Sequence, residues 1–188
     1  MSLHDRFNER LEGTQRAVDH VRSALPAIVT MAEAIRDRLE AGGTLFTCGN
    51  GGSAAEALHL AEELIGRYRA DRAPIAASCF NADPTAITCI ANDYGFDEIF
   101  ARPARALIKA PDVLVVFTTS GNSENITRAL RIARERGAMT IGLLGRDGGE
   151  AKPLCDHAVI VPGSDSAPIQ EGHQIVMHLL CEAVDDLG

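Results

Sequence analysis

A histidine and a glutamate stand four residues apart in the first half of the chain, at His59 and Glu63. If this segment is helical, the two side chains share one face. An imidazole and a carboxylate at this spacing can bind one divalent metal ion or form one acid/base pair. Alone, the pair is more typical of an ordinary surface contact. The adjacent Glu62 is expected to point elsewhere and is the poorer candidate.

A second polar set lies near the end of the chain, in a segment that is otherwise apolar. Gln170, Gln174 and His178 follow one another at steps of four, so a helix places them on one stripe. Polar groups along a core-facing helix are costly unless they find partners. The cluster therefore favours a functional site over a set of satisfied core residues. His173 is rotated away from His178 and is expected to have a separate, structural or inter-subunit role.

Two further segments combine glycines with hydroxyl or amide side chains. Residues 48–53 read Cys-Gly-Asn-Gly-Gly-Ser, and residues 118–123 read Thr-Thr-Ser-Gly-Asn-Ser. Glycine lets the backbone approach a ligand, and the N–H groups at a helix start favour an anion. The second segment has four hydroxyls and no charge, which suits a phosphate monoester. Ordinary turns and helix caps would explain one such loop, but two of them favour a phosphorylated small ligand.

The elements that must position these residues alternate along the chain. Apolar periodicity predicts a helical extension over residues 1–43, divided near Pro26, whose long apolar stripe we interpret as an oligomer contact as well as a core contact. Short apolar runs follow at 44–48, 74–78, 113–118, 140–144 and 158–161, separated by helical patterns at about 53–66, 97–109, 123–136, 150–155 and 168–187. This alternation predicts an α/β fold with a doubly wound five-stranded parallel sheet and helices on both faces. Both polar loops then follow strands, at the carboxyl edge where such sheets bind ligands.

Composition bounds the class of protein. A chain of 188 residues fits one domain spanning residues 1–188, and a net charge of −8 without a Lys/Arg cluster argues against a nucleic-acid partner. No apolar run suggests a signal peptide or a membrane span, so a cytoplasmic location is expected. The cysteines have no metal-ligand spacing and are interpreted as reduced thiols; they are Cys48, Cys79, Cys89, Cys155 and Cys181.

Six motifs together point to a known family. They lie at residues 48–53, 59–68, 91–96, 119–123, 146–149 and 169–173, and so extend over almost the whole chain. They resemble those of the phosphoheptose isomerases, which are sugar-isomerase (SIS) domain proteins. The two loops are shared by SIS proteins with several functions. The set of His59, Glu63, Gln170 and His178 is much more specific.

The resemblance implies an aldose–ketose isomerase that converts sedoheptulose 7-phosphate to D-glycero-D-manno-heptose 7-phosphate through an enediol(ate), the first step toward ADP- or GDP-heptose. It implies a homotetramer with active sites at subunit interfaces. It also implies one zinc ion per subunit, bound by His59, Glu63, Gln170 and His178, with Glu63 and His178 as the acid/base pair. The implied substrate-binding residues are Asn50, Gly51, Gly52, Ser53, Glu63, Asn92, Asp93, Thr118, Thr119, Ser120, Ser123 and Gln170.

The residue types fit this chemistry independently of the resemblance. A carboxylate such as Glu63 can move a proton between neighbouring carbons, and His178 can exchange protons with the oxygens. A divalent cation would stabilise the developing enediolate oxygens. Phosphate held by a remote loop positions the reacting carbons. A glutamate bound tightly to zinc is a poorer base, so either the metal is loosely bound or Glu63 leaves it during turnover.

Three alternatives remain open from the sequence. A non-catalytic SIS adaptor, resembling the replication-initiator-associating proteins, would lack residues matching Glu63 and His178, which this chain keeps. An isomerase of another sugar phosphate, such as a pentose phosphate, would share the fold and both loops. A DNA-binding regulator would need a helix-turn-helix domain, for which the first forty residues are too few and too acidic. The chain departs from the family pattern at Thr118, where Ser is frequent, and at Ala167 and Pro168, where Asp and Arg are frequent.

Overall fold

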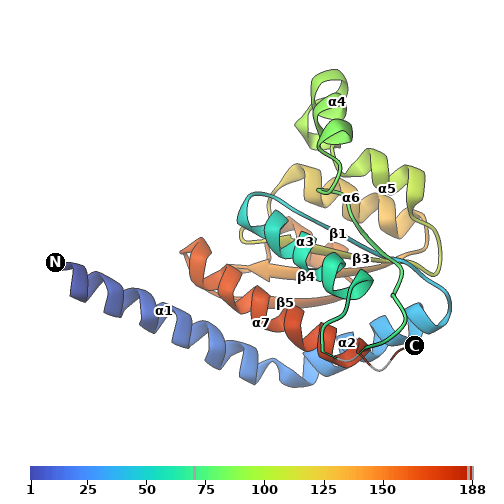
Figure 1. The fold of residues 1–188 in the computed structure, drawn as a ribbon. Coiled ribbons are helices and arrows are strands. Elements are labelled where there is room, and N and C mark those ends of the chain that lie inside the picture. The colour runs from blue at the N-terminus through green and yellow to red at the C-terminus, as the bar shows by residue number, and fades with distance from the viewer. Residues whose placement is uncertain (70, 186, 188) are drawn as a thin grey trace.

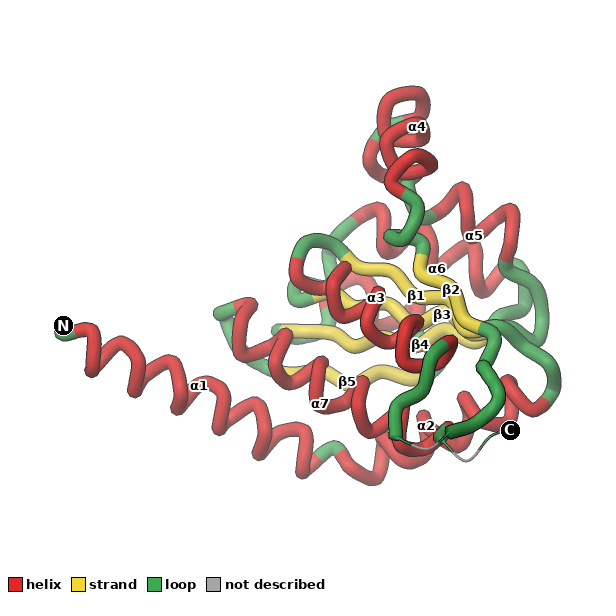
Figure 2. Tube along the Cα trace, viewed as in Figure 1, coloured by secondary structure: helices red, strands yellow, loops and turns green. Residues whose placement is uncertain are grey.

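The computed structural model of the protein describes residues 1–69, 71–185 and 187. Two consecutive helices, α1 (Leu3–Ser23) and α2 (Leu25–Glu40), precede a sheet that is wrapped by helices (Figures 1 and 2). The remaining elements are β1 (Leu45–Gly49), α3 (Gly52–Ile65), β2 (Ala77–Cys79), α4 (Pro84–Tyr94), η1 (Phe96–Glu98), α5 (Ala101–Leu107), β3 (Val113–Thr118), α6 (Glu124–Glu135), β4 (Met139–Gly145), η2 (Gly149–Leu154), β5 (His157–Val161) and α7 (Ser166–Val184).

The sheet has five parallel strands in the order β2-β1-β3-β4-β5. This confirms the predicted doubly wound α/β fold. From β1 the chain moves outward to β2 and then returns to place β3 on the other side of β1. The strand order therefore reverses between β1 and β3, and the loops after these two strands flank a crevice of the kind that binds ligands in open α/β sheets.

Helices cover both faces of the sheet, because alternate residues of each strand point to opposite sides. On β3, Val113, Val115 and Phe117 belong to the core shared with α1, α2, α3 and α7. Leu114 and Val116 belong to the second core, which contains residues of α5 and α6. Every residue of β1, β3 and β4 is buried, which explains why their sequences are continuous apolar runs rather than alternating ones.

The N-terminal extension divides as expected. The chain breaks between α1 and α2 at Ala24, and Pro26 occupies the first turn of α2, where its missing N–H loses no helical hydrogen bond. Helix α1 packs along α7, where Arg10 and Thr14 both bond the Glu171 carboxylate. No helix in the described part of the chain is both long and apolar enough to cross a membrane.

Several boundaries differ from the predicted ones, and one helix is new. Residues 84–94 form α4, which apolar periodicity does not predict because none of its residues is buried. Its start is instead encoded locally: Asp83 accepts the backbone N–H groups of Thr85 and Ala86, and Pro84 follows at the first helical position. The strand expected at 74–78 is only Ala77–Cys79, and the helix expected at 97–109 is a short 3-10 turn followed by α5.

The side chain of Asp112 provides a test of how the strands are anchored at their starts. It is 2% exposed and accepts the backbone N–H of Thr44 at 2.8 Å and that of Lys109 at 2.9 Å. We expect Asp112→Ala to lower the free energy of unfolding by about 1–3 kcal/mol, since two partly buried hydrogen bonds from backbone N–H groups lose their acceptor. Urea denaturation measures this, with Glu135→Ala on the exposed face of α6 as the control. Equal stability of the two variants would contradict the anchoring role.

Candidate active site

The two polar loops meet at the reversal point of the sheet. Together they line a cavity of about 60 Å³ whose walls are Asn50, Ser53, Phe117, Thr118, Thr119, Ser120 and Ser123. The first loop follows β1 and begins α3, and the second follows β3 and begins α6. Two helix N-termini and several hydroxyls therefore approach one space. This arrangement suits an anionic group, because backbone N–H groups and hydroxyls can donate to it.

The first loop depends on its glycines and on one amide pair. Gly51 has φ of 60°, a conformation that a side chain disfavours, and the Gln170 amide lies where a side chain on Gly52 would be. Asn50 and Asn125 exchange two amide hydrogen bonds, of 3.0 and 2.9 Å. Because Asn125 is in the first turn of α6, this pair ties the two loops together directly.

The second loop is held by its own hydroxyls. Thr118 Oγ1 accepts the backbone N–H of Gly121 at 3.2 Å, and Ser120 Oγ accepts that of Asn122 at 3.2 Å. Ser123 is the N-cap residue of α6, but its side chain makes no capping hydrogen bond. The Ser123 hydroxyl and the first N–H groups of α6 therefore remain available to a ligand in the cavity.

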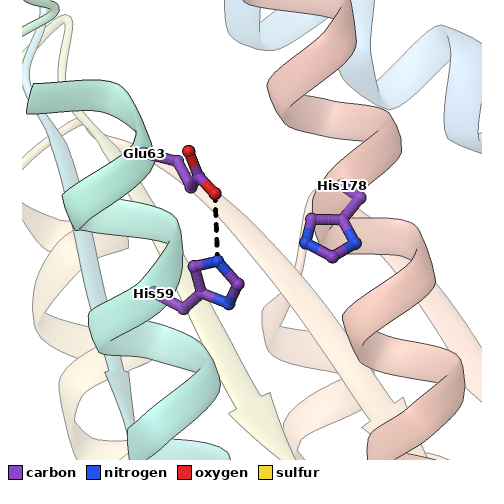
Figure 3. A group of neighbouring side chains, drawn as sticks. All are labelled: His59, Glu63 and His178. Carbon is purple, nitrogen blue, oxygen red and sulfur yellow. Dashed lines mark hydrogen bonds and ion pairs between the residues drawn. The ribbon is translucent and has the colours of Figure 1, made fainter. Parts of the chain in front are cut away.

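The His/Glu pair lies on the third and fourth turns of α3 and meets His178 from α7 (Figure 3). His59 Nε2 and Glu63 Oε1 are 3.0 Å apart. One ligand atom each from His59, Glu63 and His178 lie within 4.8 Å of one another, and all three residues are partly buried. The His178 ring stacks on Tyr68 with the centroids 5.7 Å apart. Two imidazoles and a carboxylate form a donor set that can hold a divalent metal ion with a position left open.

Two glutamines of α7 differ in their placement. Gln174 lies beside the histidines, with its Nε2 2.8 Å from His59 Nδ1 and 3.3 Å from His178 Nε2. Gln170 instead lies against Gly52 at the start of α3, seven residues before His59 on the same helix. Seven helical residues span about 10 Å, so Gln170 lies closer to the two glycine- and hydroxyl-rich loops than to the histidines. Its part in metal binding stays a prediction.

Asn92 and Asp93 are not brought to the other site residues within one chain. Both are exposed in the last turn of α4, where Asn92 Nδ2 donates to Asp93 Oδ1 at 2.7 Å. Helix α4 makes its main contact with η1 and projects away from the sheet (Figure 1). Neither residue is among those that line the cavity between the two loops.

Two ionisable side chains are buried behind the site. Burial lowers the pKa of His173 to about 4, and the ring lies 6.4 Å from that of Phe117. The expectation of a separate role for His173 agrees with this position in the core. Glu56 on α3 is 6% exposed, and neither carboxylate oxygen has a hydrogen-bond partner among the described residues. Burial raises the pKa of Glu56 to about 8.

Asn125 and Glu56 were not singled out from the sequence, although each carries a signal. Asn125 stands four residues before Ala129, on a buried stripe of α6, where an amide is unexpected. Glu56 stands four residues before Leu60 and so shares the buried face of α3. In both cases a polar side chain stands within an apolar stripe, and this position, rather than the residue type, identifies the residue as a candidate for the site.

The buried carboxyl of Glu56 gives a pH-dependent prediction. The unfolded chain ionises this group near pH 4.5, whereas the folded chain keeps the proton up to about pH 8, so its contribution to stability is lost as pH rises between these values. We expect Glu56→Gln to become more stable than wild type over this interval, on the order of a few kcal/mol by about pH 8. Thermal unfolding from pH 5 to 9 measures this, with Glu62→Gln as the exposed control. A variant less stable than wild type at pH 8 would show that the ionised carboxylate has a partner.

Comparison with known proteins places the chain in a family. A SIS domain model matches residues 10–145. The phosphoheptose isomerase of Pelobacter propionicus is 45% identical over 164 residues, which cover 87% of this chain and 87% of that protein. The phosphoheptose isomerase of Geobacter sp. strain M21 is 42% identical over 182 residues, which cover 94% of this chain and 95% of that protein.

Solved structures agree with the sequence relatives. A phosphoheptose isomerase from Francisella tularensis superposes with a TM-score of 0.94 at 36% identity, covering 98% of this chain and 99% of that one. The corresponding enzyme from Neisseria gonorrhoeae has a TM-score of 0.92 at 37% identity, covering 99% of this chain and all of that one. The predicted resemblance is thereby confirmed: the chain belongs to the phosphoheptose isomerase family of SIS-domain proteins.

Proposed function

We propose that this protein is an aldose–ketose isomerase that converts sedoheptulose 7-phosphate to D-glycero-D-manno-heptose 7-phosphate, as the names of its relatives indicate for them. The observation that carries the proposal is the cluster of His59, Glu63 and His178, held between α3 and α7. A proton-transfer pair beside a candidate cation site is what an enediolate mechanism needs. The same cluster argues against a non-catalytic adaptor.

The substrate phosphate is assigned to the cavity between the two loops. Thr119, Ser120 and Ser123 offer hydroxyls, and the starts of α3 and α6 offer backbone N–H groups. Asn50, Gly51, Gly52, Ser53 and Thr118 complete this set, and Gln170 borders it at Gly52. Phosphate binding at a fixed point supplies the energy that positions the distant carbons beside Glu63.

Glu63 is assigned as the group that carries the proton between the two reacting carbons. Isomerisation removes a proton from the hydroxyl-bearing carbon next to the carbonyl and returns one to the former carbonyl carbon, leaving an enediolate between the two steps. His178 exchanges protons with the two oxygens, whose roles as carbonyl and hydroxyl are interchanged. The stacking of His178 on Tyr68 fixes the plane in which that exchange occurs.

A divalent cation, zinc by family resemblance, is assigned to His59, Glu63 and His178, with Gln170 as the fourth ligand implied by that resemblance. When bound, zinc would stabilise negative charge on the enediolate oxygens. Glu63 then has two roles, as ligand and as base. Glu63 Oε1 lies within hydrogen-bond distance of His59 Nε2. His59 would therefore keep the Glu63 carboxylate in the site if Glu63 left the cation to act as the base.

We further propose a cytoplasmic homotetramer with active sites completed at subunit interfaces. The extension at residues 1–43 exposes large apolar side chains on α1 and α2, which a second copy can cover; they are Leu3, Phe7, Leu11, Leu25 and Val29. Asn92 and Asp93 lie away from the cavity of their own chain, so an interface is the simplest way to bring them to a substrate. The free thiols fit a reducing compartment.

The acid/base assignment predicts the effect of two substitutions by glutamine. We expect Glu63→Gln and His178→Gln to reduce kcat for sedoheptulose 7-phosphate by about 10²–10⁴-fold, because each removes a proton-transfer group. Glu62→Gln is the matched control, since Glu62 is exposed on the same helix. Circular dichroism verifies that each variant is folded. A Glu63→Gln variant with wild-type kcat would refute the assignment, and an inactive wild type would direct the search to other sugar phosphates.

Removal of metal tests the cation assignment separately. We expect dialysis against a chelator to abolish isomerisation and stoichiometric zinc to restore it, while far-UV circular dichroism stays unchanged. His59→Ala should raise the zinc concentration needed for half-maximal recovery, because it removes one of three ligands. Full activity of protein shown by elemental analysis to be metal-free would establish that Glu63 and His178 act without a cation.

A further inference from the structure

Among the residues that the structure describes, Gln174 is the polar side chain that contacts both histidines of the site without a part in the proposed chemistry. It lies on α7 one turn before His178 and faces α3. Its Nε2 is 2.8 Å from His59 Nδ1 and 3.3 Å from His178 Nε2. The Gln174 side chain is partly buried. A single amide thus bridges the two helices at the candidate metal site.

The proton positions in this bridge follow from simple counting. With its nitrogen facing the two imidazoles, the amide offers one N–H group to each ring, so in this orientation both contacted ring nitrogens accept. His59 Nδ1 then carries no proton, and the neutral ring holds its proton on Nε2. That nitrogen is 3.0 Å from Glu63 Oε1, which can accept it. Gln174, His59 and Glu63 therefore form one consistent chain of donors and acceptors.

The opposite amide orientation is equally well defined. If Gln174 presents its carbonyl oxygen to a neutral His59 ring, Nδ1 must donate and Nε2 becomes a bare lone pair facing the Glu63 carboxylate. Two lone pairs at 3.0 Å repel each other unless a cation lies between them. For a neutral His59 ring, the orientation of the Gln174 amide is thus coupled to whether a proton or a metal ion lies between His59 and Glu63.

We propose that Gln174 is a positioning residue whose amide sets which ring nitrogen of His59 carries the proton, and that it turns over when a divalent cation replaces the proton between His59 and Glu63. This inference rests on the proposed cation site. A metal-bound histidine usually donates its other N–H to a fixed acceptor, and such acceptors strengthen metal binding. Gln174 fills that place for His59. His178 depends on it less, because Tyr68 also holds the His178 ring.

Two substitutions separate the parts of this role. Gln174→Leu keeps the size of the side chain but removes donor and acceptor, and we expect zinc affinity to fall about 10–100-fold. Gln174→Glu keeps an acceptor for His59 Nδ1, so zinc affinity should equal or exceed that of wild type. Gln15→Leu, which removes an exposed glutamine from α1, is the control for the substitution itself. Competition with a chromogenic chelator measures affinity, and thermal unfolding detects any general loss of structure.

Nuclear magnetic resonance of the His59 ring nitrogens gives a second readout that does not depend on activity. We expect the proton on Nε2 in metal-free wild type and on Nδ1 after zinc is added. A proton already on Nδ1 in the metal-free protein would overturn the proposed turning of the amide. Unchanged zinc affinity in Gln174→Leu would overturn the positioning role alone, whereas a wild type that binds no zinc would overturn the cation site itself.

Discussion

Helices α3 and α7 pack against one another on the same face of the sheet, and the chemistry of the protein depends on that contact. Their apolar residues bury against β1, β3 and β4, which fixes the distance between the helices. Polar side chains line part of the contact between α3 and α7, which we call the α3–α7 seam. In it, Gln170 lies at Gly52, and Gln174 and His178 lie at His59. A seam of this kind is stable only when its members satisfy one another. The arrangement that satisfies them is also one that can hold a cation or exchange a proton.

The two ends of this seam have different tasks. Near the starts of α3 and α6, the chain presents N–H groups, hydroxyls and an amide pair without a net charge, as a phosphate group requires. About two to three turns farther along α3, His59 and Glu63 lie beside His178 of α7 and present a carboxylate and two imidazoles. The rigid α3 helix links the anchoring end to the reacting end. In the proposed function, the phosphate of the substrate lies at the first end and its reacting carbons at the second.

Particular residues show what the sequence could and could not predict. The bounds of β3 were predicted correctly at 113–118, because a strand buried on both faces is a continuous apolar run. Helix α4 was missed because none of its residues is fully buried, although Asp83 and Pro84 mark its start. The spacing of His59 and Glu63 revealed a shared face, since that relation is local. The contact of Gln174 with His59 joins residues 115 positions apart, so only the packing of two helices could reveal it.

The most direct test of this account is X-ray diffraction at the zinc absorption edge, from crystals grown with zinc. The account predicts an anomalous peak within about 2.0–2.2 Å of a ring nitrogen of His59 and an oxygen of Glu63, with His178 completing the site. It also predicts that the peak lies on the α3–α7 seam in every copy of the chain. An ordered crystal with zinc bound elsewhere, and none between His59 and Glu63, would contradict the central claim.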